Sequence, residues 1–201
     1  GFIFVGMAFM KDGTKAYTDL PIFRNAFMVM GSNPILGVLA GVVVTGIMQS
    51  SSAVVGILQT IASTGGAVTA ASAMFISLGS NIGSCFTAMI SSIGAPRNAK
   101  RAAIIHLLFN VIGTIIFGSI IFVFCLFNQR LASASINSVG ISVFHTVFNV
   151  LNTMLLLPFS NLLVQASKYF VKNDEDEEQD ETKKLLQHLD DRILESPTFA
   201  V

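Results

Sequence analysis

Long apolar stretches separated by short polar ones make up most of the first 170 residues. Residues 102–127 and 139–157 are each almost continuously apolar. Because about 20 residues of helix cross the hydrocarbon of a bilayer, each stretch predicts one transmembrane helix. Residues 67–93 are equally long, but a polar cluster interrupts their centre. The pattern therefore predicts helices that span a membrane, one of them unusual.

Residues 35–63 show a different pattern, in which two shorter apolar halves flank four consecutive polar residues: Gln49, Ser50, Ser51 and Ser52. As helices, residues 35–48 would be roughly 21 Å long and residues 53–63 roughly 16 Å. Neither half crosses about 30 Å of hydrocarbon alone. Asn33 and Pro34 suit the cap and the first position of the first half. Two half-length helices around a polar break are typical of a re-entrant hairpin or a broken transmembrane helix.

A second polar cluster follows about thirty residues later, as Gly79-Ser80-Asn81-Ile82-Gly83-Ser84. Two glycines four residues apart often allow close packing of membrane helices. The polar residues around them favour, at least as strongly, an unwound backbone that exposes carbonyl groups. We therefore expect a second helix break here.

Composition supports the membrane interpretation. The chain is 52% hydrophobic and 12% charged, with a mean hydropathy of +0.69, whereas soluble domains carry about 25% charged residues. No charged side chain occurs between Arg24 and Arg97, and no carboxylate between Asp19 and Asp174. The predicted fold class is an all-α integral membrane protein. Cys85 and Cys125 lie in apolar surroundings without metal spacing, so we expect packed thiols.

The end of the chain has a different composition. Ten of the twelve acidic residues lie beyond position 173. We expect a membrane unit over residues 1–170, an acidic linker over 171–181, and the incomplete start of a cytoplasmic helical domain over 182–201, where leucine and isoleucine recur at helical spacing. The chain opens inside an apolar run, and we expect it to be a segment of a longer protein.

The polar break at Gln49 suggests ion chemistry. If the second half begins a helix, its free N–H groups and the serine hydroxyls converge and favour an anion. Carbonyl groups at the end of the first half, together with hydroxyls, suit Na⁺ or another hard cation. Packing is the ordinary role of serine in membrane helices. Glutamine with three serines between two half-length helices favours a site over packing, and at the second cluster the two interpretations are balanced.

Two pentads, His106 to Asn110 and His145 to Asn149, share the pattern His-x-x-Phe-Asn in successive spans. Hydrogen bonding between helices is the favoured role, ahead of a substrate role, and a proton relay lacks an acidic partner. An enzyme is not expected, because hydrolase-elbow, metalloprotease and nucleotide-loop motifs are absent from the sequence. A dyad of Ser51 with His106 or His145 is the disfavoured alternative.

Several motifs occur in a fixed order and resemble the sodium-dependent phosphate cotransporter family. They are Asn33-Pro34, the signature Gln49-Ser50-Ser51-Ser52-Ala53, the stretch from Leu78 to Ser84, Thr87 in register, and Ala99-Lys100-Arg101-Ala102 before His106-x-x-Phe109-Asn110. The resemblance covers roughly residues 1 to 160. The stretch from Leu189 to Val201 also resembles the opening of the PhoU-like helical domain of many bacterial members.

The resemblance implies two inverted repeats, each with a hairpin and a broken helix, that meet at a phosphate and Na⁺ site. Only one copy of the signature is present, so this chain resembles the second repeat. The missing repeat or a second chain, possible as a homodimer, would complete the site. Ser84-Cys85 departs from the family's usual threonine but keeps a hydroxyl.

The resemblance also implies site residues. Those expected to contact substrate and ion are Gln49, Ser50, Ser51 and Ser52, with Ser80, Asn81, Ser84 and Thr87 opposite. The Na⁺ ligands would come from Gln49, Ser50, Ser51 and Asn81. Supporting residues would be Thr45, His106, Asn110, His145 and Asn149.

The positive-inside rule and the predicted hairpin disagree about the side of the membrane on which the first cations lie. Arg97, Lys100 and Arg101 form a basic loop, which the positive-inside rule places in the cytoplasm together with Lys168 and Lys172. A hairpin over residues 35–63 then enters from outside and leaves three cations, Lys11, Lys15 and Arg24, outside as well. A broken but crossing helix would satisfy the charges. We expect the hairpin, because of the half-lengths and the resemblance.

The predicted function is Na⁺-coupled symport of inorganic phosphate across the cell membrane by alternating access, with Na⁺ as coupling ion and no other cofactor. The expected partners are phosphate, Na⁺ and the lipid bilayer; nucleic acid is not among them. The alternatives are a phosphate exporter or channel-like activity, and a non-transporting module for assembly or regulatory docking through the acidic tail.

Overall fold

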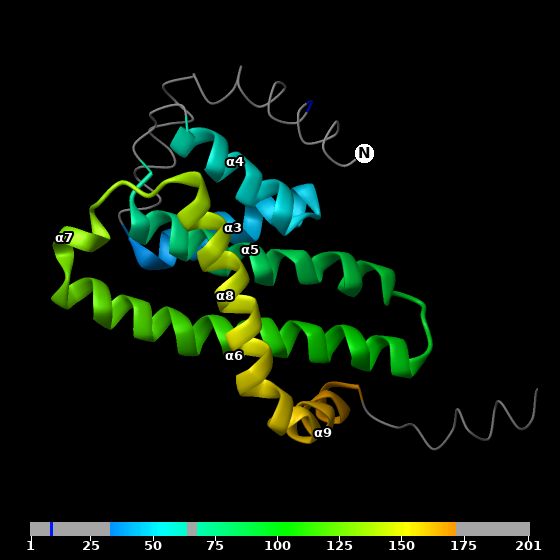
Figure 1. Cartoon of the computed structure of the whole chain (residues 1–201). Helices are drawn as coiled ribbons and strands as arrows, with labels where there is room; N and C mark the ends of the chain where they lie inside the picture. The colour runs from blue at the N-terminus through cyan, green and yellow to red at the C-terminus, as the bar shows by residue number, and fades with distance from the viewer. Residues whose placement is uncertain (1–8, 10–32, 64–67, 172–201) are drawn as a thin grey trace, which may run out of the picture.

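The computed structural model describes residues 9, 33–63 and 68–171, and these are helical almost throughout (Figure 1). The helices are α3 (Pro34–Met48), α4 (Ser51–Ser63), α5 (Ala70–Ser91), α6 (Arg97–Phe127), α7 (Gln129–Ala132), α8 (Ser138–Leu156) and α9 (Ser160–Phe170), with a 3₁₀ turn over Leu157–Phe159. In the described part, three helices are long and apolar enough to cross a membrane, or four if α3 and α4 count as one broken span. The all-α membrane fold class is confirmed.

Helices α3 and α5 pack so closely that side chains are excluded between them. A Cβ atom on Gly79 would lie 1.9 Å from the Val38 carbonyl oxygen, and one on Gly83 would lie 2.6 Å from that of Val42. A Cβ on Gly41 would lie 2.1 Å from the Ile76 carbonyl oxygen. Because the contacts advance by four residues on both helices, α3 and α5 run in the same direction. Glycine allows this approach of two backbones.

The expected helix break at residues 79–84 is wrong, since α5 is one continuous helix over Ala70–Ser91. Three polar side chains of this stretch donate to carbonyl groups of the same helix. The Ser80 hydroxyl and the Asn81 amide donate to the Ser77 carbonyl oxygen at 2.8 and 3.1 Å, and the Ser84 hydroxyl donates to the Asn81 carbonyl oxygen at 2.7 Å. Serine and asparagine can therefore occupy a membrane helix here without unwinding it.

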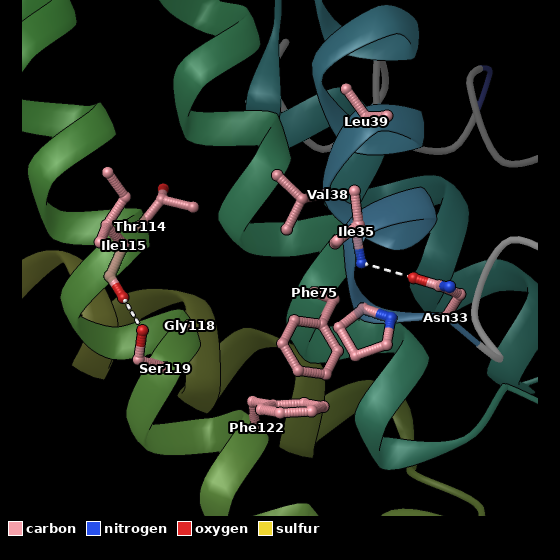
Figure 2. A pocket seen from close by; sticks show the side chains of 11 residues that line it. Asn33, Ile35, Val38, Leu39, Phe75, Thr114, Ile115, Gly118, Ser119 and Phe122 are labelled. Carbon is pink, nitrogen blue, oxygen red and sulfur yellow. Dashed lines mark hydrogen bonds between the residues drawn. The ribbon is translucent and has the colours of Figure 1, made fainter.

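Helices α3 and α4 form a hairpin, because the chain bends by 119° between them. The Asn33 side chain caps α3, accepting from the Ile35 N–H at 2.9 Å, as predicted. Near the end of α4, the Gln59 amide donates to the Ser138 carbonyl oxygen at 3.2 Å and to the Ser142 hydroxyl. Asn33 and Phe122, which lies late in α6, line the same cavity (Figure 2), so both outer ends lie toward the α7 end. This geometry supports the re-entrant hairpin; Lys11, Lys15 and Arg24 lie outside the described residues.

The apolar face of α4 holds the hairpin against the rest of the molecule. Val54, Leu58 and Ile61, which recur at helical spacing, are buried together with Ile76 of α5 and Ile141 of α8. These side chains pack α4 onto α5 and α8. The two halves of the hairpin are thus fixed differently, α3 by glycine contacts and α4 by side chains.

Helix α6 runs back along α5, joined by polar contacts. The Thr114 hydroxyl donates to the Leu78 carbonyl oxygen at 3.3 Å, and the Asn110 amide lies 3.3 Å from the Cys85 sulfur. Cys85 is a buried free thiol, as predicted, whereas the free thiol of Cys125 is only half-buried.

Helix α8 crosses α6 instead of running alongside it (Figure 1). At the crossing, Asn152 fills the space above Gly113, and the rings of Phe117 and Phe148 meet edge to face with centroids 5.3 Å apart. After the 3₁₀ turn at Pro158, α9 returns to the start of α6, where the Arg101 guanidinium donates to the Val171 carbonyl oxygen at 3.2 Å.

The Arg101 contact places Lys168 at the same end as the basic loop, as expected. Lys172, most of the acidic linker (171–181) and the helical segment 182–201 lie outside the described residues, so those boundaries stay predictions.

We predict that Gly79→Ala lowers the thermal stability of the detergent-purified protein, because the added methyl group would collide with the Val38 carbonyl and force α3 away. Overpacking typically costs about 1–3 kcal/mol, and a collision with backbone places this substitution toward the upper value. Gly118→Ala is the matched control, since its nearest neighbour would be 3.6 Å away. Equal melting temperatures for the two variants would contradict the close α3–α5 contact.

Candidate functional site

We name four consecutive polar residues the polar turn: Gln49 and Ser50, which lie between α3 and α4, and Ser51 and Ser52, which begin α4. Gln49 has φ 55° and ψ 24°, the only positive φ at a non-glycine residue in the described part. Its N–H donates to the Thr45 carbonyl oxygen at 2.6 Å, which ends α3. Helices usually end this way on glycine or asparagine. A glutamine held in this conformation, with its side chain exposed, is the kind of strained residue that clusters at functional sites.

The three serines surround the N-terminus of α4. The Ser50 hydroxyl accepts from the Ala53 N–H at 3.3 Å and so caps the helix. Ser51 is half-buried and Ser52 is exposed in the first helical turn. The first N–H groups of a helix lack intrahelical partners and lie at the positive end of its dipole. The polar turn therefore combines backbone donors and hydroxyls in the arrangement that suits an anion.

Thr45 lies one helical turn before Gln49 and is fully buried. Its Oγ1 has no hydrogen-bond partner among the described residues. The side chain packs against Gly83, where a Cβ atom would lie 2.7 Å from the Thr45 Cβ. A buried hydroxyl without a partner is costly, of the order of 1–3 kcal/mol. The Thr45 hydroxyl is therefore a buried polar group at the end of α3 whose hydrogen-bonding capacity is unused among the described residues.

The predicted residues of α5 do not form one cluster at the polar turn. Ser80 and Asn81 are buried, Ser84 is half-buried and Thr87 is exposed. No hydrogen bond of the described residues joins any of them to the polar turn. Since Gly46 lies against the Phe86 ring, α3 ends at the level of Thr87, about two turns beyond Ser80. Of the four, Thr87 is the one that the packing brings to the level of the turn.

The predicted supporting residues of α6 and α8 have separate surroundings. Asn110 is buried and bonds between helices, to Cys85, as well as to the His106 carbonyl oxygen at 3.0 Å. Asn149 donates to the His145 carbonyl oxygen at 2.7 Å within α8. The His145 Nε2 atom is buried without a partner among the described residues. The predicted bond between helices is thus confirmed for Asn110 but not for Asn149.

Asn152 was not singled out in the sequence. It is fully buried, its amide donates to the Phe109 carbonyl oxygen at 3.4 Å, and its Oδ1 has no partner in the described part. The available signal was its helical spacing from Ile141, His145 and Phe148 on one face of α8.

A cavity of about 570 Å³ opens at the other end of α3, between α3, α5 and α6 (Figure 2). Asn33, Val38, Phe75, Thr114 and Phe122 are among its lining residues. Its walls are mainly apolar, and it lies away from the polar turn.

We predict that Thr45→Val raises, or leaves unchanged, the melting temperature in buffer without Na⁺ or phosphate. Valine keeps the shape and removes a buried hydroxyl that lacks a partner. Thr60→Val is the matched control, because its hydroxyl donates to the Gly56 carbonyl oxygen at 2.9 Å, and its loss should lower stability by about 1 kcal/mol. A clear loss of stability in Thr45→Val would show that this hydroxyl is satisfied within the protein.

Comparison with known proteins identifies the family. Residues 2–155 match the family described as "Na+/Pi-cotransporter". "Uncharacterized protein YqeW" of Bacillus subtilis (strain 168) is 35% identical over 124 residues, covering 62% of this chain and 39% of the relative. "Putative inorganic phosphate export protein YjbB" is 26% identical over 201 residues in Salmonella typhimurium and 25% over 202 residues in Escherichia coli (strain K12), covering 100% of this chain and 36% of each relative.

The chain therefore spans between 36% and 39% of the length of these relatives. No solved structure matches it. The family match covers most of the chain and includes the polar turn, the glycine contacts of α5 and the whole of α6. The chain belongs to the Na⁺/Pi-cotransporter family: it is a multi-pass membrane protein of a transporter family and not an enzyme.

Proposed function

We propose that the polar turn binds inorganic phosphate together with Na⁺, and that the full-length protein uses this site to move phosphate across the cell membrane, coupled to Na⁺, by alternating access. The observation that carries the proposal is the turn itself: an N-terminal helix end with three serines, preceded by a strained glutamine, inside an apolar hairpin. Family membership supports phosphate and Na⁺ as the transported species.

Phosphate would bind at the start of α4. The N–H groups of Ser51 and Ser52 have no carbonyl acceptors earlier in their own helix, and both hydroxyls lie beside them. A dianion bound there gains from the helix dipole and from hydrogen bonds to a charged acceptor, which are stronger than neutral ones. Gln49 can add amide donors. Since Ser52 and Gln49 are exposed, the anion would reach the turn from the open side.

Na⁺ would bind at the end of α3, where carbonyl groups are freed by the bend. We propose Gln49, Ser50 and Ser51 as ligands, as the resemblance implies, and add Thr45, whose buried hydroxyl lacks a partner. Asn81 would coordinate through its amide oxygen, because its amide nitrogen donates to the Ser77 carbonyl oxygen at 3.1 Å. No carboxylate lies between Asp19 and Asp174, so Na⁺ and phosphate would neutralise one another inside the membrane.

The rest of the site is proposed to come from outside this chain. Gln49, Ser52 and Thr87 are exposed at one level of the molecule, where a second wall could meet them. The relatives are more than twice as long as the aligned segment. The remainder of the full-length protein, or a second copy, would supply that wall.

Phosphate export is the second candidate function. The relatives that align with all of this chain carry export in their printed names. A coupled carrier works in both directions, and the gradients decide the net flux, so the same polar turn serves uptake or export. The alternative of a non-transporting module that only docks a partner protein is less well supported. Such a module would need neither the unpartnered hydroxyl of Thr45 nor a helix end suited to an anion.

We predict that Ser51→Ala in the full-length protein, reconstituted in liposomes, lowers Na⁺-dependent flux of radiolabelled phosphate by about tenfold or more. A hydrogen bond to a charged group is worth roughly 1.5–3 kcal/mol. Ser63→Ala, at the other end of α4, should retain normal flux, since its hydroxyl bonds only the Thr60 carbonyl oxygen in the described part. Unchanged flux in Ser51→Ala would remove the polar turn from the substrate site, and flux that is equal with K⁺ and Na⁺ would contradict the coupling.

A further inference from the structure

Helix α9 has three sides of different character. Leu163 and Ser167 are buried at 6% and 0% exposure, on the side that packs on α6. A second side is apolar and exposed, with Leu162 at 62%, Tyr169 at 79% and Phe170 at 61%. The third is polar and exposed: Asn161, Gln165 and Lys168. At 3.6 residues per turn the apolar and polar sides are adjacent arcs of the helix.

Neither water nor hydrocarbon alone suits this helix. In water, two aromatic rings and a leucine would stay exposed next to one another. In hydrocarbon, a lysine and two amides would lack partners. The boundary between the two is the environment in which both arcs are solvated, as in amphipathic helices that lie flat in a membrane surface.

The position of α9 agrees with such a boundary. With 31 residues, α6 is roughly 46 Å long, which exceeds the hydrocarbon thickness of about 30 Å. Its first turns, which carry Lys100 and Arg101, therefore project toward the headgroups. The Arg101 guanidinium holds the end of α9 there through the Val171 carbonyl oxygen, at 3.2 and 3.4 Å. The same contact brings Lys168, three residues before Val171, to the end of α6 that carries Lys100.

We propose that α9 and the start of α6 form a surface for anionic phospholipids in the bilayer. The side with Leu162, Tyr169 and Phe170 lies among the acyl chains. The exposed ammonium groups of Lys100 and Lys168 face the headgroup phosphates, and charge complementarity selects anionic over zwitterionic lipid. Aromatic residues next to basic ones at this level are typical of membrane interfaces. The inference does not depend on the transported substrate.

The depth of α9 can be measured with one substitution. The chain contains no tryptophan, so Tyr169→Trp introduces a single fluorophore once any tryptophan elsewhere in the full-length protein is replaced by phenylalanine. In nanodiscs with brominated phosphatidylcholine, bromine near the carbonyl end of the acyl chain should quench it more than bromine near the methyl end. Ile115→Trp, exposed in the middle of α6, should show the reverse order. Stronger quenching of Tyr169→Trp from the methyl end, or no quenching by lipid, overturns the interfacial position.

Lipid selectivity is tested with Lys100→Gln and Lys168→Gln in bilayers of phosphatidylcholine mixed with phosphatidylglycerol. The readout is the preference for spin-labelled phosphatidylglycerol over spin-labelled phosphatidylcholine. Each variant should lose about fivefold of this preference at low salt, and the loss should shrink at high salt. Arg130→Gln, exposed on α7 at the other end of α6, removes the same charge and should change nothing.

Two outcomes would overturn the selectivity. One is an equal preference in the parent and both lysine variants. The other is a parent protein without any lipid preference, in which the preference arises only when the acidic residues of 174–181 are replaced by amides. That result would show that the acidic segment of the chain, and not lipid, binds the basic surface.

Discussion

The contact between α3 and α5 is a contact of two backbones, and the position of the polar turn depends on it. With glycine at positions 41, 79 and 83, carbonyl groups of one helix lie where Cβ atoms would be on the other. Where two backbones meet directly, no flexible side chain can absorb a shift, so these contacts fix the register of the two helices. The register in turn sets the level at which α3 ends, beside Phe86 and Thr87. A strained glutamine and three serines are thereby held at one depth in an apolar protein.

The second half of the hairpin is held by different means. Helix α4 packs its apolar face on α5 and α8, and its Gln59 side chain bonds the start of α8. Helix α4 thus connects the serines at its start to α8, the span that crosses α6. Asn152 above Gly113, with an oxygen that lacks a partner, lies at that crossing.

Much of this architecture could be predicted from the order of apolar and polar residues. The half-lengths on either side of Gln49, the Asn33 cap and the placement of Lys168 beside the basic loop all followed from spacing and charge. The break expected at residues 79–84 did not occur, because serine and asparagine bonded carbonyl groups of their own helix, and spacing cannot show which acceptor they choose. Close packing, the alternative that the four-residue glycine spacing allowed, is what the structure contains. Asn152 and the buried state of the Thr45 hydroxyl depend on how distant helices cross, which a single sequence does not show.

The most direct test of the central claim is the accessibility of Ser52→Cys in the full-length protein to a polar thiol reagent. The binding of phosphate with Na⁺ at the polar turn predicts that labelling slows several-fold when both are present, but not with phosphate and K⁺. Cys85 is buried, the parent protein gives the background of the native thiols, and Ser133→Cys, exposed beyond α7, should label at one rate in all conditions. A Ser52→Cys labelling rate that is the same with and without phosphate and Na⁺ would contradict the account.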